Sequence, residues 1–148
     1  MDAQDRILIE RECERLVTLY CHYVDHGEAA RVADLFAEDG TWEGPGVSMK
    51  GRAEIRAGFQ QRQDHKARMS RHVCSNLLVD VIDEGHAKGA VYLTLYRHDG
   101  EEGRPFAPIE APVMVGEYAD RFVRTSEGWR FQERVTTAAF VKQPAPKS

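Results

Sequence analysis

Two side chains in this sequence are suited to proton transfer, and Asp25 is the first of them. It lies near the end of a predicted amphipathic helix, where the helix dipole disfavours a carboxylate by roughly 0.3–1 kcal/mol. The helical period places it about 100° from the centre of the apolar stripe, at the edge of the stripe. An acid at such a position indicates a function, and burial would raise its pKa toward a value useful for proton transfer. The alternative is an exposed acid near a helix end.

His72 is the second candidate. It begins a predicted strand and shares its alternation with Cys74 and Asn76, so without a bulge these three side chains face the same side. The opposite alternation is apolar: Val73, Leu77, Val79 and Val81. Polar residues at one end of one strand face indicate the polar end of an otherwise apolar cavity. The alternative is a structural histidine beside the basic stretch 65–71.

The elements that position these residues follow from the spacing of apolar side chains. A helix is predicted over residues 3–26, because apolar residues recur every three or four positions at Ile9, Cys13, Leu16, Tyr20 and Val24. Gly27 follows as its end. Further helices are predicted for residues 28–37 and 52–63, the second anchored by Ile55 and Phe59. Between them lie two short strands, 41–43 and 47–49, separated by Gly44-Pro45-Gly46.

The second half of the chain changes to extended structure. Four long strands are predicted at 72–82, 86–97, 111–124 and 129–140, and consecutive strands joined in this way favour an antiparallel meander. The fold class is therefore α+β: a cone-shaped barrel made by a curved, mainly antiparallel sheet around three N-terminal helices, with an interior pocket. Residues 1–148 form one domain, and residues 143–148 have the composition of a loose tail.

Composition limits the partners. The chain has 148 residues, 42% hydrophobic and 30% charged, which is typical of a globular domain. The net charge of −4 gives no general attraction for nucleic acid, and no apolar run is long enough to cross a membrane. The charged first residues are unlike a secretory signal. Three scattered cysteines suggest reduced thiols and a cytoplasmic protein.

Several short motifs together resemble the nuclear transport factor 2-like superfamily. They are Tyr20 with Asp25, Val32-x-Asp34-Leu35-Phe36 with Asp39-Gly40, Lys50-Gly51 with Ile55, Arg71-His72 with Asn76, Gly116-x-Tyr118-x-Asp120-x-Phe122, and Gly128-Trp129-x-Phe131. The most similar branch is the SnoaL-like group that includes scytalone dehydratase. The resemblance covers roughly residues 8–140. It implies the fold more strongly than any reaction, because this superfamily holds enzymes of many kinds and silent binding proteins.

The resemblance implies a catalytic pair. In dehydratases of this superfamily an aspartate on the first helix and a histidine at a strand start act together, and these roles fall on Asp25 and His72. The carboxylate would fix the imidazole tautomer and stabilise the imidazolium. Such a pair supports a lyase (dehydratase) or an isomerase that needs neither a metal nor an organic cofactor. A second histidine of the scytalone dehydratase set has no convincing match here, which argues against the identical reaction.

The expected ligand is a small apolar, oxygenated or cyclic molecule. Candidate lining residues, each of which could instead be ordinary core, are Tyr20, Tyr23, Trp42, Asn76, Tyr92, Tyr96, Tyr118 and Arg134. A buried tyrosine could present its hydroxyl to a substrate oxygen, and Trp42 offers a flat wall for a ring. Self-association into a dimer or trimer is expected through the outer face of the sheet, as the resemblance implies.

Two other interpretations remain open. A silent ligand carrier or an assembly module, such as an oxygenase small subunit, would use the same fold. His22 and His26 have the i, i+4 spacing of a metal clip, but both project away from the apolar stripe, so a solvated face is the better interpretation and no metal site is predicted.

Overall fold

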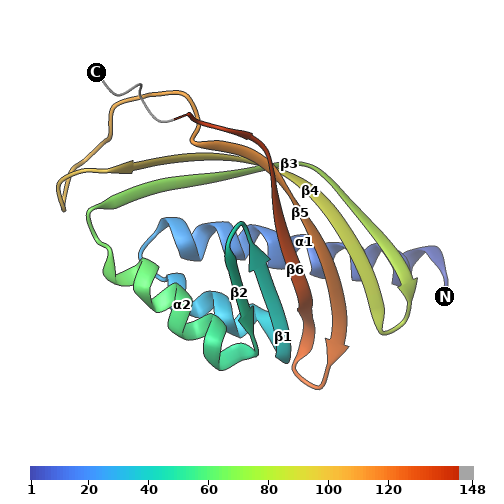
Figure 1. Ribbon diagram of the computed structural model, residues 1–148. Helices are drawn as coiled ribbons and strands as arrows, with labels where there is room; N and C mark the ends of the chain where they lie inside the picture. The colour runs from blue at the N-terminus through green and yellow to red at the C-terminus, as the bar shows by residue number, and fades with distance from the viewer. Residues whose placement is uncertain (144–148) are drawn as a thin grey trace.

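Three helical segments lie against one face of a six-stranded sheet (Figure 1). The structure is a computed structural model that describes residues 1–143, so most of the predicted tail lies outside the described residues. The segments are the α-helix α1 (Ala3–Asp25), the 3₁₀ helix η1 (Ala29–Leu35) and the α-helix α2 (Arg52–Asp64). The predicted second helix is shorter than expected, because Phe36 already begins a strand.

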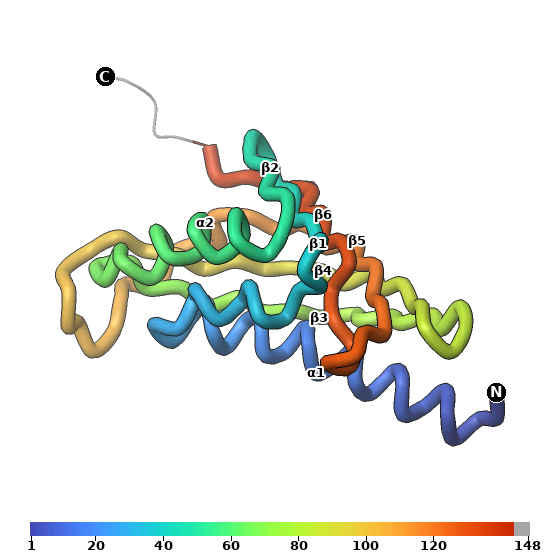
Figure 2. Tube along the Cα trace, turned by 90° about the horizontal axis from the view of Figure 1, so that it is seen from below, coloured from blue at the N-terminus to red at the C-terminus, as the bar shows by residue number. Residues whose placement is uncertain are grey.

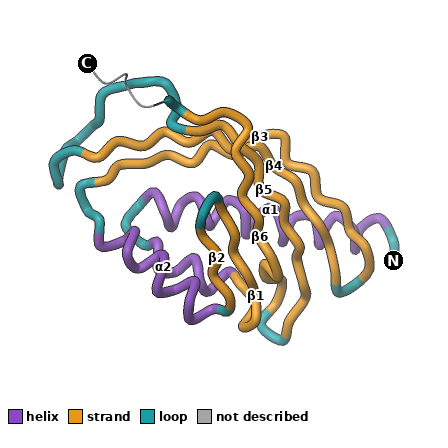
Figure 3. Tube along the Cα trace, in the orientation of Figure 1, coloured by secondary structure: helices purple, strands orange, loops and turns teal. Residues whose placement is uncertain are grey.

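The sheet is mixed and open (Figure 3). Its strands are β1 (Phe36–Gly44), β2 (Val47–Lys50), β3 (Arg68–Asp83), β4 (His86–Asp99), β5 (Met114–Thr125) and β6 (Gly128–Val141), in the order β2-β1-β6-β5-β4-β3. The last four form the predicted antiparallel meander. β1 pairs in parallel with β6, and β2 and β3 are the two edges. The expected cone is confirmed, with a sheet that does not close on itself.

The core fills the space between the helices and the concave face of the sheet. η1 lies between α1 and α2 (Figure 2), so the three segments form one layer. The apolar stripe predicted for α1 is buried as expected at Ile9, Cys13, Leu16, Tyr20 and Val24. α2 is anchored by Ile55 and Phe59, both buried. Local periodicity therefore determined which faces enter the core.

β3 contains a bulge that the sequence analysis did not foresee. The register against β4 shifts between Ser75 and Leu78, and Asn76 has a φ of 55°. The extra residue reverses the alternation, so Val73 is exposed on the outer face whereas Leu77 packs against the core. The expectation that Val73 and Leu77 share one face is therefore wrong.

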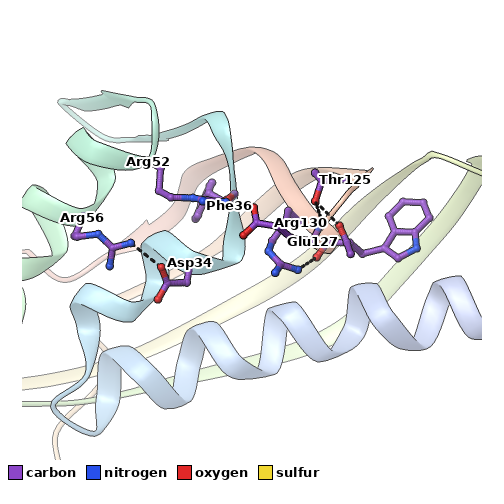
Figure 4. Close-up of polar contacts among 9 residues, drawn as sticks. Asp34, Phe36, Arg52, Arg56, Thr125, Glu127 and Arg130 are labelled. Carbon is purple, nitrogen blue, oxygen red and sulfur yellow. Dashed lines mark hydrogen bonds and ion pairs between the residues drawn. The ribbon is translucent and has the colours of Figure 1, made fainter.

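Ion pairs and a hydrogen bond connect α2 to its neighbours at one end of the molecule (Figure 4). Arg56 reaches Asp34 of η1 at 2.6 Å, while Arg52 donates to the Phe36 carbonyl at 2.6 Å and to Glu127 of the β5–β6 turn at 3.1 Å. The opposite end collects the last turns of α1 and α2, the start of β3 and the long loop between β4 and β5 (Figure 1). No helix within residues 1–143 has the length and apolarity needed to span a bilayer.

Candidate active site

Asp25 and His72 meet at this second end of the molecule. Asp25 is the last residue of α1, and His72 lies on β3, an element that packs directly against α1. Their side chains approach to 2.7 Å between Oδ1 of Asp25 and Nδ1 of His72. The backbone N–H of His72 also donates to Oδ2 of Asp25 at 2.8 Å. Both side chains are nearly buried, with 5% of Asp25 and 11% of His72 exposed.

Ser70 completes the surroundings of this carboxylate. Its hydroxyl donates to Oδ1 of Asp25 at 2.8 Å and accepts a 2.9 Å hydrogen bond from Arg62 of α2. Ser70 is absent from the predicted site because the predicted strand begins at residue 72, after the basic stretch 65–71. β3 begins earlier, at Arg68, where it pairs with Asp99 of β4. The signal that could have found Ser70 is its alternation, since it lies two residues before His72.

The pKa of Asp25 is shifted in the direction opposite to the one expected from the sequence. Burial does raise it, but the hydrogen bonds and charge of His72 together with the Ser70 hydroxyl outweigh burial, and the pKa falls below its ordinary value. Asp25 is therefore an ionised acceptor at neutral pH, not an acid poised to give up a proton. Three donors reaching one carboxylate explain how an acid is tolerated at a helix C-terminus.

The carboxylate also decides the histidine tautomer. An ionised carboxylate can only accept hydrogen bonds, so Nδ1 of His72 carries the hydrogen and Nε2 is the basic nitrogen. Among the described residues, no side chain or backbone group bonds to Nε2. An oriented imidazole with a free basic nitrogen is the arrangement that general-base chemistry requires.

A cavity of about 390 Å³ lies beside His72. Its walls are largely apolar and come from α1, the β1–β2 hairpin, α2 and β4: Val24, Trp42, Val47, Met49, Phe59 and Leu95. Its polar side consists of Ser70 and His72 with Gln61, Arg62, Arg68 and Arg97. The volume suits a small molecule of one or two rings.

Trp42 borders this cavity, but three other predicted lining residues lie beneath it. Tyr20, Tyr118 and Arg134 are buried, and the guanidinium of Arg134 stacks over the Tyr118 ring at 3.6 Å and the Tyr20 ring at 4.3 Å. Trp42 donates from its indole to the Tyr20 hydroxyl at 3.1 Å. Because these three side chains are buried, a ligand in the cavity cannot contact them directly. Among the described residues, neither of these two tyrosine hydroxyls faces the cavity, contrary to expectation.

Arg134 has a partner that fixes it there. It forms two hydrogen bonds with Asp120, at 2.8 and 3.2 Å, and neither side chain has any exposed surface. Burial favours neutral Arg134, but the Asp120 charge prevails and raises the pKa of Arg134 above its ordinary value. Arg134 therefore remains charged inside the core, whereas burial raises the pKa of Asp120 against the opposing charge of Arg134.

Four predicted lining residues lie away from the cavity. Tyr23 packs under the Arg31 guanidinium of η1, at 4.4 Å. Asn76 sits in the bulge, exposed. Tyr92 and Tyr96 are 48% and 40% exposed on the outer face, because Leu93 and Leu95 take the inward positions of β4. None of these four residues lines the cavity beside His72 in the described structure, although Tyr23 is partly buried against the core.

His22 and His26, the two histidines with metal-binding spacing, are not joined by a third ligand among the described residues. His22 and His26 stack on each other at 5.7 Å on the exposed side of α1. Within residues 1–143 no group of three histidine, cysteine or acidic side chains is arranged to hold a metal ion.

Comparison with known proteins identifies the family of this chain. The profile of the SnoaL-like domain matches residues 5–135. The chain belongs to the SnoaL-like family. The expected resemblance to the nuclear transport factor 2-like superfamily is thereby confirmed.

Solved structures share the fold of this SnoaL-like chain at low identity. A candidate scytalone dehydratase from Novosphingobium aromaticivorans is 18% identical, with a TM-score of 0.80, over 99% of this chain and 95% of that one. A hexachlorocyclohexane dehydrochlorinase, LinA-type3 from Novosphingobium barchaimii, is 15% identical, with a TM-score of 0.75, over 95% and 93%. A variant of a protein of unknown function from Mycobacterium tuberculosis is 25% identical, with a TM-score of 0.74, over 93% and 76%. No curated protein matches this chain.

Proposed function

We propose that this SnoaL-like protein is a lyase of the dehydratase type, or an isomerase, that uses Asp25 and His72 to move a proton. The observation that carries the proposal is the 2.7 Å contact between the two side chains beside a largely apolar cavity. Two structural neighbours are named as a candidate dehydratase and a dehydrochlorinase, and both names denote eliminations, which supports the same class of chemistry here.

The proposed reaction begins at a carbon next to a carbonyl group. Nε2 of His72 takes the proton, the C–H electrons form an enolate, and Asp25 stabilises the resulting imidazolium. In an elimination, the enolate electrons form a C=C bond and expel a hydroxide, which receives the proton from His72 and leaves as water. In an isomerisation, the imidazolium returns the proton to a different carbon. Both outcomes share the first step, so one experiment can test both.

Deuterium exchange measures that first step directly. A panel of one- and two-ring ketones, including β-hydroxy ketones and β,γ-unsaturated ketones, would be incubated with the protein in D₂O and followed by proton NMR. We expect at least one compound to exchange its α-hydrogen, lose water or shift its double bond. His72→Gln and Asp25→Asn should each reduce the rate by about 10²–10⁴-fold.

The chain offers a matched control for this experiment. His86 and Asp83 form a second Asp–His pair, at 2.8 Å, but it is exposed in the β3–β4 turn and lines no cavity among those described. His86→Gln and Asp83→Asn should leave the rate unchanged. Exchange that persists in folded His72→Gln protein would contradict the proposed role of His72.

A binding or assembly role is the second candidate. It is favoured by the apolar side chains that the described surface exposes, among them Leu78 and Tyr92 on the sheet and Phe106 and Ile109 on the β4–β5 loop. A silent module would bind ring compounds without any exchange, and its affinity would not depend on Asp25. Self-association through the outer face stays a prediction, which light scattering across a concentration series can test.

A further inference from the structure

Three arginines converge on the rim of the cavity beside His72. Arg62 comes from the last turn of α2, Arg68 from the start of β3 and Arg97 from the end of β4. They are close enough for the positive charges to act on one another: Arg68 and Arg97 both lower the pKa of Arg62, after burial as the main cause. We call these three residues the rim arginines.

The acidic side chains nearby neutralise only part of this positive charge, although Asp25 and Asp99 both act on Arg62 against the two arginines. Arg68 is held by Asp99 in a two-pronged ion pair, at 2.7 and 3.0 Å. Asp25 already accepts bonds from His72 and Ser70. Among the described residues, no carboxylate pairs with Arg62 or Arg97, and the guanidinium of Arg97 makes no hydrogen bond. Arg62 uses only Nη2, so its other donors remain free.

The concentration of positive charge is local. The chain as a whole carries a net charge of −4. Yet in the adjoining hollow at the end of α1, which Arg62 and Arg68 also line, basic side chains outnumber acidic ones by five to three. Like charges brought together without partners cost free energy that a bound anion would offset.

We propose that two of the rim arginines, Arg62 and Arg97, bind a carboxylate of the substrate, so that this protein acts on an apolar organic acid. Two planar guanidinium groups with free donors match the fork of a carboxylate. The inference rests on the proposed function in one respect, because it takes the cavity beside His72 as the place where the substrate binds.

The strand register places the backbone of Arg97 near that of His72. In the β3–β4 ladder, Leu95 is opposite His72, and Arg97 is opposite Ser70. The backbone of Arg97 is therefore offset from the position opposite His72 by two residues, about 7 Å along the strands. The ring of such a substrate would lie against Trp42 and Phe59, which also line the cavity.

The test compares two probes of the same shape and different charge, 2-naphthoate and its neutral amide, 2-naphthamide. Their dissociation constants would be measured by calorimetry for the wild-type protein and for Arg97→Gln. We expect the wild type to bind naphthoate at least tenfold more tightly than the amide. Arg97→Gln should reduce that preference to less than threefold, with affinity for the amide unchanged.

Controls separate a local effect from general electrostatics. Arg121→Gln removes a positive charge from a side chain that is 72% exposed and pairs with Glu133, and it should keep the full preference. Arg62→Gln serves as the second test variant, with thermal unfolding to verify that both variants fold. Equal affinity for the two probes in the wild type, or an unchanged preference in folded Arg97→Gln, overturns the proposal.

Failure of this inference can be told apart from failure of the proposed function. Asp25→Asn and His72→Gln should abolish deuterium exchange but keep the preference for naphthoate. Exchange of neutral ketones by a protein with no preference for naphthoate would overturn the carboxylate site alone. A preference for naphthoate that depends on Arg97, without exchange of any ring acid or ketone, would support the site and count against the enzyme.

Discussion

The hydroxyl of Ser70 lies 2.8 Å from Oδ1 of Asp25, the same oxygen that accepts the hydrogen of His72 Nδ1. Ser70 is almost completely buried, and Arg62 donates to it from the other side. Through these two hydrogen bonds Ser70 connects Arg62 of α2 to the Asp25 carboxylate on α1. The proposed base is therefore oriented by three elements, α1, α2 and β3, and not by the Asp–His pair alone.

Ser70→Ala should weaken this orientation without removing the base. Loss of a donor to an ionised carboxylate should raise the pKa of Asp25 toward its ordinary value, because the Ser70 bond is one of the causes that lower it. We expect the deuterium-exchange rate to fall about fivefold, equivalent to about 1 kcal/mol. Carbon-detected NMR of the Asp25 carboxyl group measures the pKa. Ser75→Ala, on the exposed side of β3, is the control; an unchanged Asp25 pKa in Ser70→Ala would refute the positioning role.

Asp25→Asn should make stability depend less on pH. The pKa of Asp25 is lower in the folded state than in the unfolded state, so its contribution to the free energy of unfolding is complete above about pH 3.9 and is lost as pH falls through the folded-state pKa. At pH 7 we expect Asp25→Asn to lose about 1–3 kcal/mol. Urea unfolding at pH 7 and at pH 3 measures the difference, which should shrink at the lower pH. The same loss at both values would count against an ionised Asp25.

The buried pair of Arg134 and Asp120 should show strong coupling. Arg134→Met leaves a carboxylate in the core without its partner and should cost about 3–5 kcal/mol in unfolding free energy. Replacing both residues, Arg134→Met with Asp120→Leu, should recover most of that loss, because no uncompensated charge remains. Urea unfolding of the two single variants and the double variant gives the coupling energy. Additive losses would mean that the two charges do not stabilise each other.

The bulge at Asn76 should respond to backbone preference. Its φ of 55° is accessible to asparagine and glycine, but it is unfavourable for a β-branched residue. We expect Asn76→Gly to change stability little and Asn76→Val to cost about 1–3 kcal/mol. Ser75→Val, at the neighbouring extended and exposed position, is the control. Equal tolerance of valine at both positions would show that the bulge can shift along β3.

Much of the site could be predicted because its two central residues belong to regular elements. The 3.6-residue period placed Asp25 at the end of α1 beside the apolar stripe, and the predicted strand that began at residue 72 marked His72, although β3 itself begins at Arg68. Tyr92 and Tyr96 could have been excluded from the cavity lining in the same way, since Val91, Leu93 and Leu95 occupy the inward-facing positions of β4. Residue type alone therefore misplaces these two tyrosines, whereas the alternation of β4 places them on the outer face.

Other features depended on contacts between distant segments. The Asp25 pKa falls because Ser70 and His72, 45 and 47 residues away, donate to the carboxylate. Arg134 does not face a ligand, because its ion pair with Asp120 holds it in the core. The bulge at Asn76 shows itself only in the register of β3 against β4.

Local patterns in the chain were enough to place the helices, the long strands and the buried faces of α1 and α2, because the periods of helix and strand are local properties. The sequence also supplied the family resemblance that paired Asp25 with His72. Contacts between distant segments set the ionisation of Asp25, the outward position of Val73 and the gathering of Arg62, Arg68 and Arg97 around one cavity. The physical reason is that strand register and helix docking set these contacts, and both are fixed only when the whole core packs.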